Sequence, residues 1–215
     1  MRTYYLHGFG SGPGSVKARW CLDGCAAYGE PVEALDLNRP TFETQSVSGL
    51  LDWIGALDEA RGPGAPPLRL IGSSYGGYLS ARYAELHPSR VERLLLLCPA
   101  FDMHARWPLI IGRDGRAEWE REGTRVIPDA AGRVHRMPWS FVVDAESHPP
   151  YPIVNGPVTI LHGERDSIVP IEYSHRFLEK VPHARLVEVD DDHSLRGSKD
   201  EFLRLLAAVF APPAA

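Results

Sequence analysis

A serine between glycines marks the place in this chain where a nucleophile is expected. Ser74 is the central residue of the segment 72–76 (GSSYG), directly after the apolar run 68–71 and directly before a helix-forming stretch. This pattern between a strand and a helix is typical of a sharp turn that holds the serine oxygen clear of the sheet. Because a serine hydroxyl is a weak nucleophile, the chemistry also requires a histidine base, an acid and donors for an oxyanion.

An acid and a histidine follow Ser74 at positions that suit those roles. Asp166 comes shortly after the β-type run 158–161, and His193 comes shortly after the run 185–189. The chain order serine, acid, histidine is that of α/β-hydrolases and differs from the orders in chymotrypsin and subtilisin. All three residues are expected in loops at the carboxyl ends of parallel strands, where open α/β sheets bind ligands. We therefore predict a triad of Ser74 as nucleophile, His193 as base and Asp166 as the acid that orients the histidine.

Other acids and histidines compete for these roles. The aspartates at 190–192 are rivals to Asp166 because they adjoin His193 in the sequence. Asp166 is favoured because it follows the strand that normally carries the acid. His7 and His162 each precede a glycine at the end of a strand, and we interpret both as structural hydrogen-bonding residues.

The spacing of Asp144, Glu146 and His148 could suggest a metal site, since carboxylate and imidazole groups are common metal ligands. Nothing else in the sequence supports metal chemistry. The prediction is therefore a site with no metal and no cofactor.

A glycine-rich loop near the N-terminus is the candidate for the oxyanion hole. The first expected strand ends at His7-Gly8, followed by Phe9 and Gly10. An oxyanion hole needs two N–H groups directed at one point, and we assign them to Phe9 and to Tyr75, the residue after the nucleophile. The alternatives are a simple glycine-rich turn or a phosphate loop, but neither GxGxxG nor GxxxxGK[ST] is present.

Strands and helices alternate along the chain, which predicts a parallel, doubly wound sheet in one domain spanning residues 1–215. The expected strands cover residues near 2–7, 31–36, 68–72, 91–97, 157–162 and 185–190. The expected helices cover residues near 14–28, 44–61, 75–87, 170–181 and 198–210. We predict six strands in the order 2-1-3-4-5-6, which is the α/β-hydrolase sheet without its first two strands.

One long connection, residues 100–157, interrupts this alternation. It contains several large aromatic side chains, namely Trp107, Trp119, Trp139 and Phe141. Its part from 124 to 141 is expected to form two short strands around the turn 129–132. Long insertions are often lids or binding loops, so we predict a cap over the acyl pocket in which Trp107 and Trp139 contact substrate. The alternative is that these aromatic residues pack on the core.

With these motifs the chain resembles the small α/β-hydrolase esterases of the YqiA type, which also begin with a strand, a HGF-type loop and a Ser-Pro-Lys-Ala-like stretch. Here that stretch is residues 12–18 (GPGSVKA). The segment from Trp139 to Pro170 is also similar to acyl-glucuronide esterases and palmitoyl-protein thioesterases of the same superfamily. The resemblance implies that Gly8 and Gly10 border the substrate. Gly10 stands where many relatives carry a bulkier residue.

Composition and charge exclude several other classes of protein. The chain has 215 residues, with 23 basic against 28 acidic side chains, which argues against nucleic acid as a partner. No apolar run is long enough for a membrane span, and the N-terminus lacks the features of a signal peptide. The three cysteines, an odd number, favour reduced thiols in the cytoplasm.

These observations predict a serine hydrolase that cleaves small-molecule carboxylic esters or thioesters through an acyl-enzyme. A dehalogenase would carry aspartate at position 74 and a dienelactone-type hydrolase would carry cysteine, whereas a C–C hydrolase can use the same triad. The alternative from another class is a catalytically silent binding protein on a hydrolase scaffold, because fold alone does not establish function.

Overall fold

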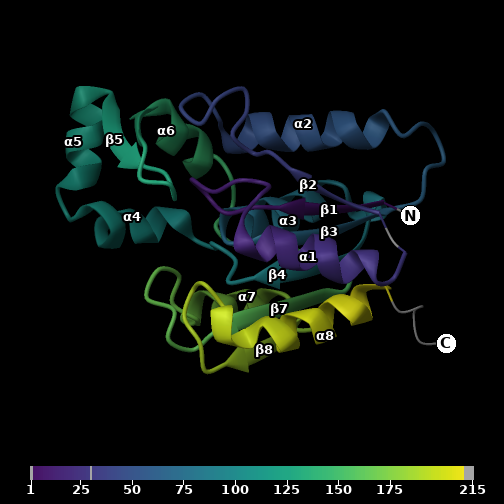
Figure 1. The fold of residues 1–215 in the computed structure, drawn as a ribbon. Helices are drawn as coiled ribbons and strands as arrows, with labels where there is room; N and C mark the ends of the chain where they lie inside the picture. The colour runs from purple at the N-terminus through teal and green to yellow at the C-terminus, as the bar shows by residue number, and fades with distance from the viewer. Residues whose placement is uncertain (1, 30, 211–215) are drawn as a thin grey trace.

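Six parallel strands form the central sheet in the order β2-β1-β3-β4-β7-β8 (Figure 1). The computed structural model describes residues 2–29 and 31–210. The strands are β1 (Arg2–Leu6), β2 (Val32–Leu35), β3 (Leu68–Ser73), β4 (Val91–Leu97), β7 (Val158–Gly163) and β8 (Arg185–Val189). This order confirms the predicted doubly wound topology.

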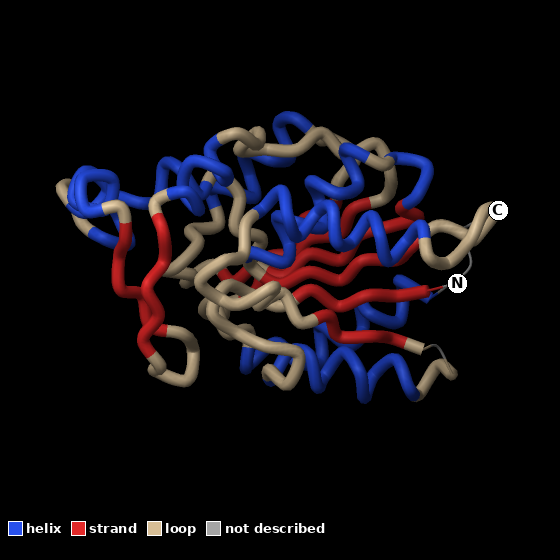
Figure 2. Tube along the Cα trace, turned by 90° about the horizontal axis from the view of Figure 1, so that it is seen from above, coloured by secondary structure: helices blue, strands red, loops and turns tan. Residues whose placement is uncertain are grey.

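The inner strands are apolar on both faces because helices cover the sheet on both sides (Figure 2). In β4, Leu94 and Leu96 face one hydrophobic cluster, and Leu95 and Leu97 face the other. Successive side chains of a strand point to opposite faces, so the continuous leucine run of β4 supplies both halves of the core. This is the pattern of a parallel strand that is covered on both faces.

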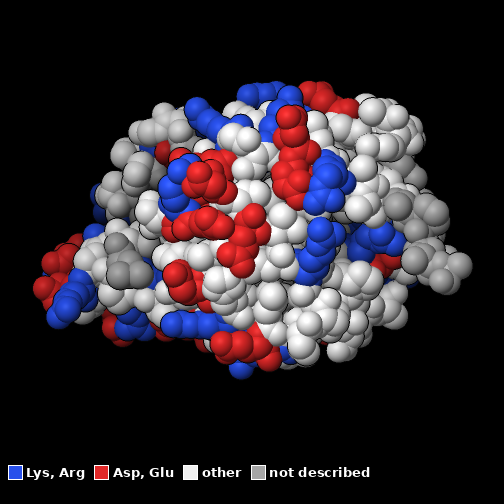
Figure 3. Space-filling view, turned by 90° about the horizontal axis from the view of Figure 1, so that it is seen from below, with Lys and Arg blue, Asp and Glu red and all other residues white. Residues whose placement is uncertain are grey.

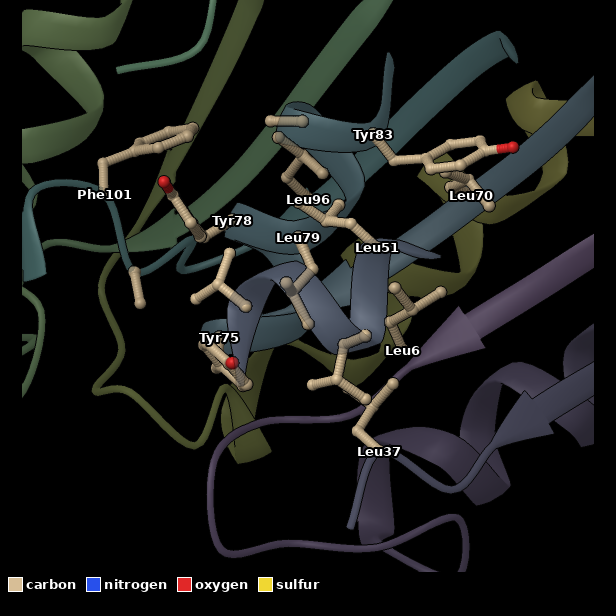
Figure 4. Packing of buried hydrophobic residues seen from close by; sticks show 14 of the residues in the cluster. Leu6, Leu37, Leu51, Leu70, Tyr75, Tyr78, Leu79, Tyr83, Leu96 and Phe101 are labelled. Carbon is tan, nitrogen blue, oxygen red and sulfur yellow. The ribbon is translucent and has the colours of Figure 1, made fainter. Parts of the chain in front are cut away.

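Two groups of helices cover the two faces. On one face, α1 (Val16–Ala26) packs beside α8 (Lys199–Phe210). The other face carries α2 (Val47–Glu59), α3 (Tyr75–Leu86) and α7 (Glu172–Lys180), and Figure 4 shows part of the core beneath them. Two short 3₁₀ helices, η1 (Pro88–Arg90) and η2 (Arg196–Ser198), belong to the connections.

Serine caps fix where two of these helices begin. The Ser15 side chain accepts a hydrogen bond from the amide of Ala18 at the start of α1, and Ser46 accepts one from Gly49 at the start of α2. Such caps satisfy amides that have no acceptor within the helix. The cap at Ser15 sets the end of the loop that follows β1, and this loop borders the candidate site.

The insertion, residues 100–157, contains three helices and a separate two-stranded antiparallel sheet. Its elements are α4 (Met103–Ile111), α5 (Gly115–Glu122), β5 (Thr124–Pro128), β6 (Val134–Pro138) and α6 (Ser140–Glu146). The hairpin of β5 and β6 confirms the two short strands predicted there. It stands apart from the central sheet, on the side where Figure 1 places α4, α5 and α6. None of the helices in the described part of the chain is long and apolar enough to cross a membrane.

Candidate active site

Ser74 occupies a strained turn between β3 and α3. Its backbone has φ 53° and ψ −114°, a left-handed conformation that is uncommon for a residue other than glycine. The neighbouring glycines permit the turn because the chain approaches other backbone closely there. A Cβ added to Gly72 would overlap the carbonyl of Gly76, and one added to Gly76 would overlap the carbonyl of Leu6. The small residues predicted around the serine are therefore required by sterics.

His193 and Asp166 are hydrogen-bonded to each other. The distance between Nδ1 of His193 and Oδ2 of Asp166 is 2.6 Å. A carboxylate can only accept, so Nδ1 carries the proton and a neutral His193 leaves Nε2 as the basic nitrogen. This is the tautomer that a general base requires.

Asp166 is buried yet held in its ionised form. Burial by itself raises the pKa of this carboxyl group, but hydrogen bonds with His162 and His193 outweigh burial and hold the pKa well below its usual range. Its other oxygen, Oδ1, accepts from the amides of Ile168 at 2.9 Å and Val169 at 2.7 Å. These bonds fix the carboxylate plane against the start of the loop that leads to α7.

Both ring nitrogens of His7 and His162 are already engaged. In His7, Nδ1 lies 2.8 Å from the carbonyl of Gly8, and Nε2 accepts from the amide of Leu37 at 2.9 Å. In His162, Nδ1 lies 2.7 Å from the Ser174 hydroxyl and Nε2 lies 2.7 Å from the carbonyl of Val169. Burial lowers the pKa of His7. The two histidines therefore brace the loops.

The rival aspartates at 190–192 have other partners. Asp190 pairs with Arg165 at 2.7 Å. Asp191 accepts from the Ser198 hydroxyl at 2.8 Å, and Asp192 accepts from the amide of Ser194 at 2.8 Å. These contacts shape the turn that carries His193, whereas the imidazole itself is bonded to Asp166.

Ser74 and His193 line one cavity of about 420 Å³. Its walls come mostly from the loop after β1, the turn at Ser74 and the loops after β7 and β8. The lining residues are Tyr5, Gly8, Phe9, Ser11, Ser15, Val16, Lys17, Ser73, Ser74, Ala130, Ser167, Ile168, Asp192, His193, Ser194 and Arg196. Several of them bear hydroxyl or charged groups, but most of the surface that lines the cavity is apolar.

The glycine-rich loop lies against the serine. A Cβ added to Gly8 would be 3.4 Å from Cβ of Ser74. Tyr75 is the first residue of α3, and the first amides of a helix have no acceptor within it. Across the described residues the structure gives neither the Phe9 amide nor the Tyr75 amide a hydrogen-bond acceptor. Both are donors of the kind that an oxyanion needs.

An aromatic cluster fixes this loop, and sequence reasoning missed it. The Phe9 ring lies 4.9 Å from Phe42, 5.8 Å from Tyr75 and 5.4 Å from Phe141, measured between ring centroids. Phe141 belongs to the insertion. The insertion thus packs directly on the loop that carries the Phe9 amide.

The two tryptophans predicted to contact substrate are not among the residues that line the cavity. Trp107 is 6% exposed and packs edge-to-face on Trp119 at 5.4 Å. Trp139 also packs on Trp119, at 6.2 Å between ring centroids, and the Arg116 guanidinium lies 5.0 Å from the Trp139 ring. Their placement matches the alternative, in which these aromatic residues pack on the core: Trp107 belongs to the core cluster and Trp139 is partly buried against it.

The insertion reaches the cavity through Ala130, at the tip of the hairpin between β5 and β6. The amide of Ala130 donates to the carbonyl of Gly10 at 2.7 Å. Gly10 has φ 67°, and a Cβ there would lie 3.3 Å from Cα of Asp129. Gly10 therefore supports the hairpin tip and does not itself line the cavity.

One group of side chains in the described part of the chain has the geometry to hold a metal ion. It consists of Cys98, Asp166 and His193, whose donor atoms lie within 4.8 Å of one another. Burial raises the pKa of the Cys98 thiol to about 12, so the protonated form dominates and opposes metal binding. The set suggested by spacing is otherwise engaged: Asp144 and His148 bond to Ser48, and Glu146 pairs with Arg116.

A family model described as "Uncharacterised protein family (UPF0227)" matches residues 2–210. Among curated proteins, the palmitoyl-protein thioesterase ABHD10, mitochondrial, of Mus musculus is 31% identical over 144 residues, which are 64% of this chain and 46% of the mouse protein. The 1-acylglycerol-3-phosphate O-acyltransferase ABHD5 of Homo sapiens is 36% identical over 108 residues, which are 44% of this chain and 28% of that protein. The matches thus span about half or less of these relatives.

Solved structures share the fold at low sequence identity. Mouse ABHD10 superposes with a TM-score of 0.77 at 22% identity, over 97% of this chain and 88% of that chain. Est1E of Butyrivibrio proteoclasticus, solved with ferulic acid bound, gives 0.79 at 19% identity, over 96% and 86% of the two chains. A monoacylglycerol lipase of Paleococcus ferrophilus gives 0.71 at 22% identity, over 97% and 93%. These likenesses show an α/β-hydrolase fold.

Proposed function

Because the chain belongs to the UPF0227 family and has the α/β-hydrolase fold, we propose that it is a serine hydrolase that cleaves carboxylic esters or thioesters. The observation that carries the proposal is the 2.6 Å bond between His193 and Asp166 at the cavity that Ser74 also lines. Relatives named as a palmitoyl-protein thioesterase and a monoacylglycerol lipase support the same reaction class.

In the proposed reaction, Oγ of Ser74 attacks the carbonyl carbon of the substrate while Nε2 of His193 takes the hydroxyl proton. The carbonyl π-electrons move to oxygen, and the amides of Phe9 and Tyr75 stabilise the oxyanion that forms. When the oxyanion collapses, the C–O or C–S bond to the leaving group breaks and His193 returns its proton to the leaving oxygen or sulfur. The products of this half-reaction are an alcohol or thiol and an acyl-Ser74 ester.

Water then completes the reaction in the same order. His193 removes a proton from a water molecule, and the resulting hydroxide oxygen attacks the acyl carbon. When the second oxyanion collapses, the bond to Oγ of Ser74 breaks, His193 returns the proton to Oγ, and a carboxylic acid leaves. Throughout both steps, ionised Asp166 holds the Nδ1 proton and stabilises the transient imidazolium. The low pKa of Asp166 keeps this carboxylate charged in both steps.

The strained turn supports Ser74 as the nucleophile, and Ser74→Ala tests it. We expect the wild-type protein to react with a fluorophosphonate probe and to hydrolyse p-nitrophenyl esters of two to sixteen carbons or an acyl-CoA. Loss of the nucleophile from a triad costs on the order of a million-fold in turnover, so Ser74→Ala should lose both reactions with an unchanged circular dichroism spectrum.

Two results would contradict the proposal. A wild-type protein silent towards the probe and all substrates would favour a binding protein on this scaffold. A Ser74→Ala variant that keeps more than roughly a few per cent of turnover would remove Ser74 from the mechanism.

The three cysteines also bear on where the protein acts. Cys21, Cys25 and Cys98 are buried and not joined by disulfides. Free, buried thiols are usual in reducing compartments, and they support the proposal that the enzyme works in the cytoplasm.

A further inference from the structure

Lys17 is a partly buried basic residue that has no role in any step of the proposed reaction. It is the second residue of α1, directly after the loop that carries Phe9, and its partly buried side chain lines the cavity. Its Nζ donates to the main-chain carbonyl oxygen of His193 at 2.9 Å. The contact joins segments that are 176 residues apart in sequence, so it ties the first loop of the site to the last.

Bonds within the turn around His193 keep it compact, and Arg165 of the loop after β7 restrains the preceding Asp190 and Asp191. Lys17 restrains the main chain of His193 itself. Asp192 accepts from Ser194, and the amide of Leu195 donates to the carbonyl of Asp192 at 3.1 Å. These bonds keep the turn compact but do not fix where it lies relative to Ser74. The hydrogen bond that Nδ1 of His193 donates to Asp166 fixes that side of the ring, whereas the position of Nε2 also depends on the main chain of His193.

The charge around Lys17 is suited to this role. Burial lowers the pKa of its ammonium group, and the nearby Cys98, Asp166, Asp192 and Asp191 oppose that lowering. Burying an ammonium group is costly unless carboxylates and acceptors compensate it. The carbonyl oxygen of His193 and these acidic neighbours supply that compensation for Lys17.

We propose that Lys17 is a positioning residue: its ammonium group holds the main chain of His193 where the imidazole can reach Ser74 across the cavity that both residues line. The proposal rests on the proposed function, because it assigns Lys17 a role in that reaction. A displacement of a catalytic group by about 1 Å can cost roughly a hundred-fold in rate. Loss of the restraint should therefore act on turnover and leave ground-state binding largely unchanged.

The test compares Lys17→Met, which keeps the length and loses the donor, with Lys17→Arg, which keeps a charged donor. Lys17→Met should lower kcat for a neutral p-nitrophenyl ester roughly 10- to 100-fold, with KM changed by less than about twofold. The rate of fluorophosphonate labelling of Ser74 should fall by the same factor. Lys17→Arg should recover a substantial part of both rates.

Arg19→Met is the matched control, because Arg19 is an exposed base of the same helix. It should leave kcat and labelling unchanged. If Lys17→Met does not fold, Lys17→Gln replaces it in the test, because glutamine is a shorter and uncharged hydrogen-bond donor. The kcat of Lys17→Gln should be lower than that of Lys17→Arg.

Three results would overturn the proposal. The first is a folded Lys17→Met with wild-type kcat and labelling rate. The second is a raised KM confined to anionic esters with kcat unchanged, which would make Lys17 a substrate contact. The third is a fall in kcat that Lys17→Arg shares in full. A wild-type protein that fails to react at all would instead contradict the proposed function.

Discussion

Three histidines lie at the ends of strands in this protein, and their hydrogen bonds decide which one can act as a base. His7 and His162 each have both ring nitrogens engaged by neighbouring groups. His193 is bonded through Nδ1 to Asp166, and across the described residues the structure gives its Nε2 no hydrogen-bond partner. All three residues are histidines, so their hydrogen-bond partners, and not the residue type, distinguish the candidate base from the other two.

Asp166 and Asp190 provide a direct comparison of the two candidate acids. Asp166→Asn should lower kcat roughly ten-thousand-fold, because an amide cannot hold the Nδ1–H tautomer or stabilise the imidazolium. Asp190→Asn should leave kcat unchanged, since Asp190 pairs with Arg165 at the surface. The measurement is kcat with a p-nitrophenyl ester for both variants. Equal losses in the two variants would contradict the assignment of Asp166.

The same carboxylate gives a pH dependence of stability. The pKa of Asp166 is lowered in the folded protein, so its contribution is fully present above the unfolded value of about 3.9 and is lost as pH falls through the folded pKa. The Tm of the wild type should therefore exceed that of Asp166→Asn at pH 6, and the difference should shrink as the pH is lowered below about 4. A difference that does not depend on pH would indicate that the asparagine variant is destabilised by packing.

At the scale of elements, the hairpin of β5 and β6 is the part of the insertion that meets the cavity. Ala130 at its tip lines the cavity, and its amide is bonded to the loop that carries Phe9. The helices of the insertion contribute aromatic residues to the core. The insertion therefore has two roles, one in packing and one at the site.

Ala130→Leu should narrow the cavity and change the order of preferred substrates. For bulky esters, kcat/KM should fall at least about tenfold relative to the two-carbon ester. A pocket that is too small by one or a few methylene groups typically lowers kcat/KM for the larger substrate by this factor or more. Ala131→Leu is the control, since Ala131 adjoins Ala130 but does not line the cavity. A uniform fall across two-, four- and eight-carbon esters would argue against the hairpin tip as a specificity element.

Trp107→Ala, by contrast, should destabilise the fold by about 3–5 kcal/mol.

His135 links the hairpin to the main body of the protein. Its Nδ1 lies 2.5 Å from Glu43 and its Nε2 lies 3.2 Å from Asp129, while Phe42 packs on the ring and Arg133 pairs with Asp129. The bond with Glu43 raises the pKa of His135, burial opposes this, and Asp129 adds to it. Burial raises the pKa of Asp129, but hydrogen bonds from the Arg133 amide, from His135 and from the Arg133 side chain outweigh it and lower the pKa to about 2.

A raised histidine pKa stabilises the fold below the unfolded value of about 6.5, and this contribution is lost as pH rises through the folded pKa. The Tm of the wild type should therefore exceed that of Glu43→Gln more at pH 6 than at pH 9. Val134→Ala, at an exposed position of the same hairpin, changes no titratable group, so its Tm difference from the wild type should be the same at both pH values. If the Tm difference between the wild type and Glu43→Gln is equal at both pH values, the charge on His135 does not stabilise the docking of the hairpin.

For the whole molecule, close packing in the centre contrasts with a mixed surface. Acidic and basic side chains are interspersed on the face shown in Figure 3, in keeping with a net charge of −5. Inside, α3 crosses the sheet so closely that Gly76 meets the backbone of β1. Stability is therefore sensitive to volume at the centre and tolerant at the periphery.

Two glycine-to-alanine substitutions measure this contrast. Gly55→Ala, in α2 where an added Cβ meets nothing within 4 Å, should stabilise the protein by about 0.5–1 kcal/mol. Gly76→Ala should instead destabilise the protein by roughly 3 kcal/mol or more, because the added methyl group meets the backbone of β1, which cannot move away. Urea denaturation of both variants gives the two values. A neutral Gly76→Ala would contradict the close approach of α3 to β1.

The sequence by itself determined the order of strands and helices, the hairpin in the insertion and the loops that carry Ser74, Asp166 and His193. These features depend on residues that are neighbours along the chain: hydrophobic runs, turn-forming glycines and the right-handed crossover that parallel strands require. The carboxyl ends of parallel strands then meet at one edge of the sheet. That rule places three distant loops together without any knowledge of side-chain packing.

Only the tertiary structure decided which other side chains share that edge. Lys17 reaches His193 because α1 docks beside the sheet, Ala130 lines the cavity because the hairpin folds back onto Gly10, and Trp107 is buried against Trp119. Each contact depends on how elements pack at long range, and many side chains of similar size could satisfy the local pattern equally well. Sequence therefore specifies the scaffold and the loops that carry the candidate triad, whereas packing selects the residues that surround them.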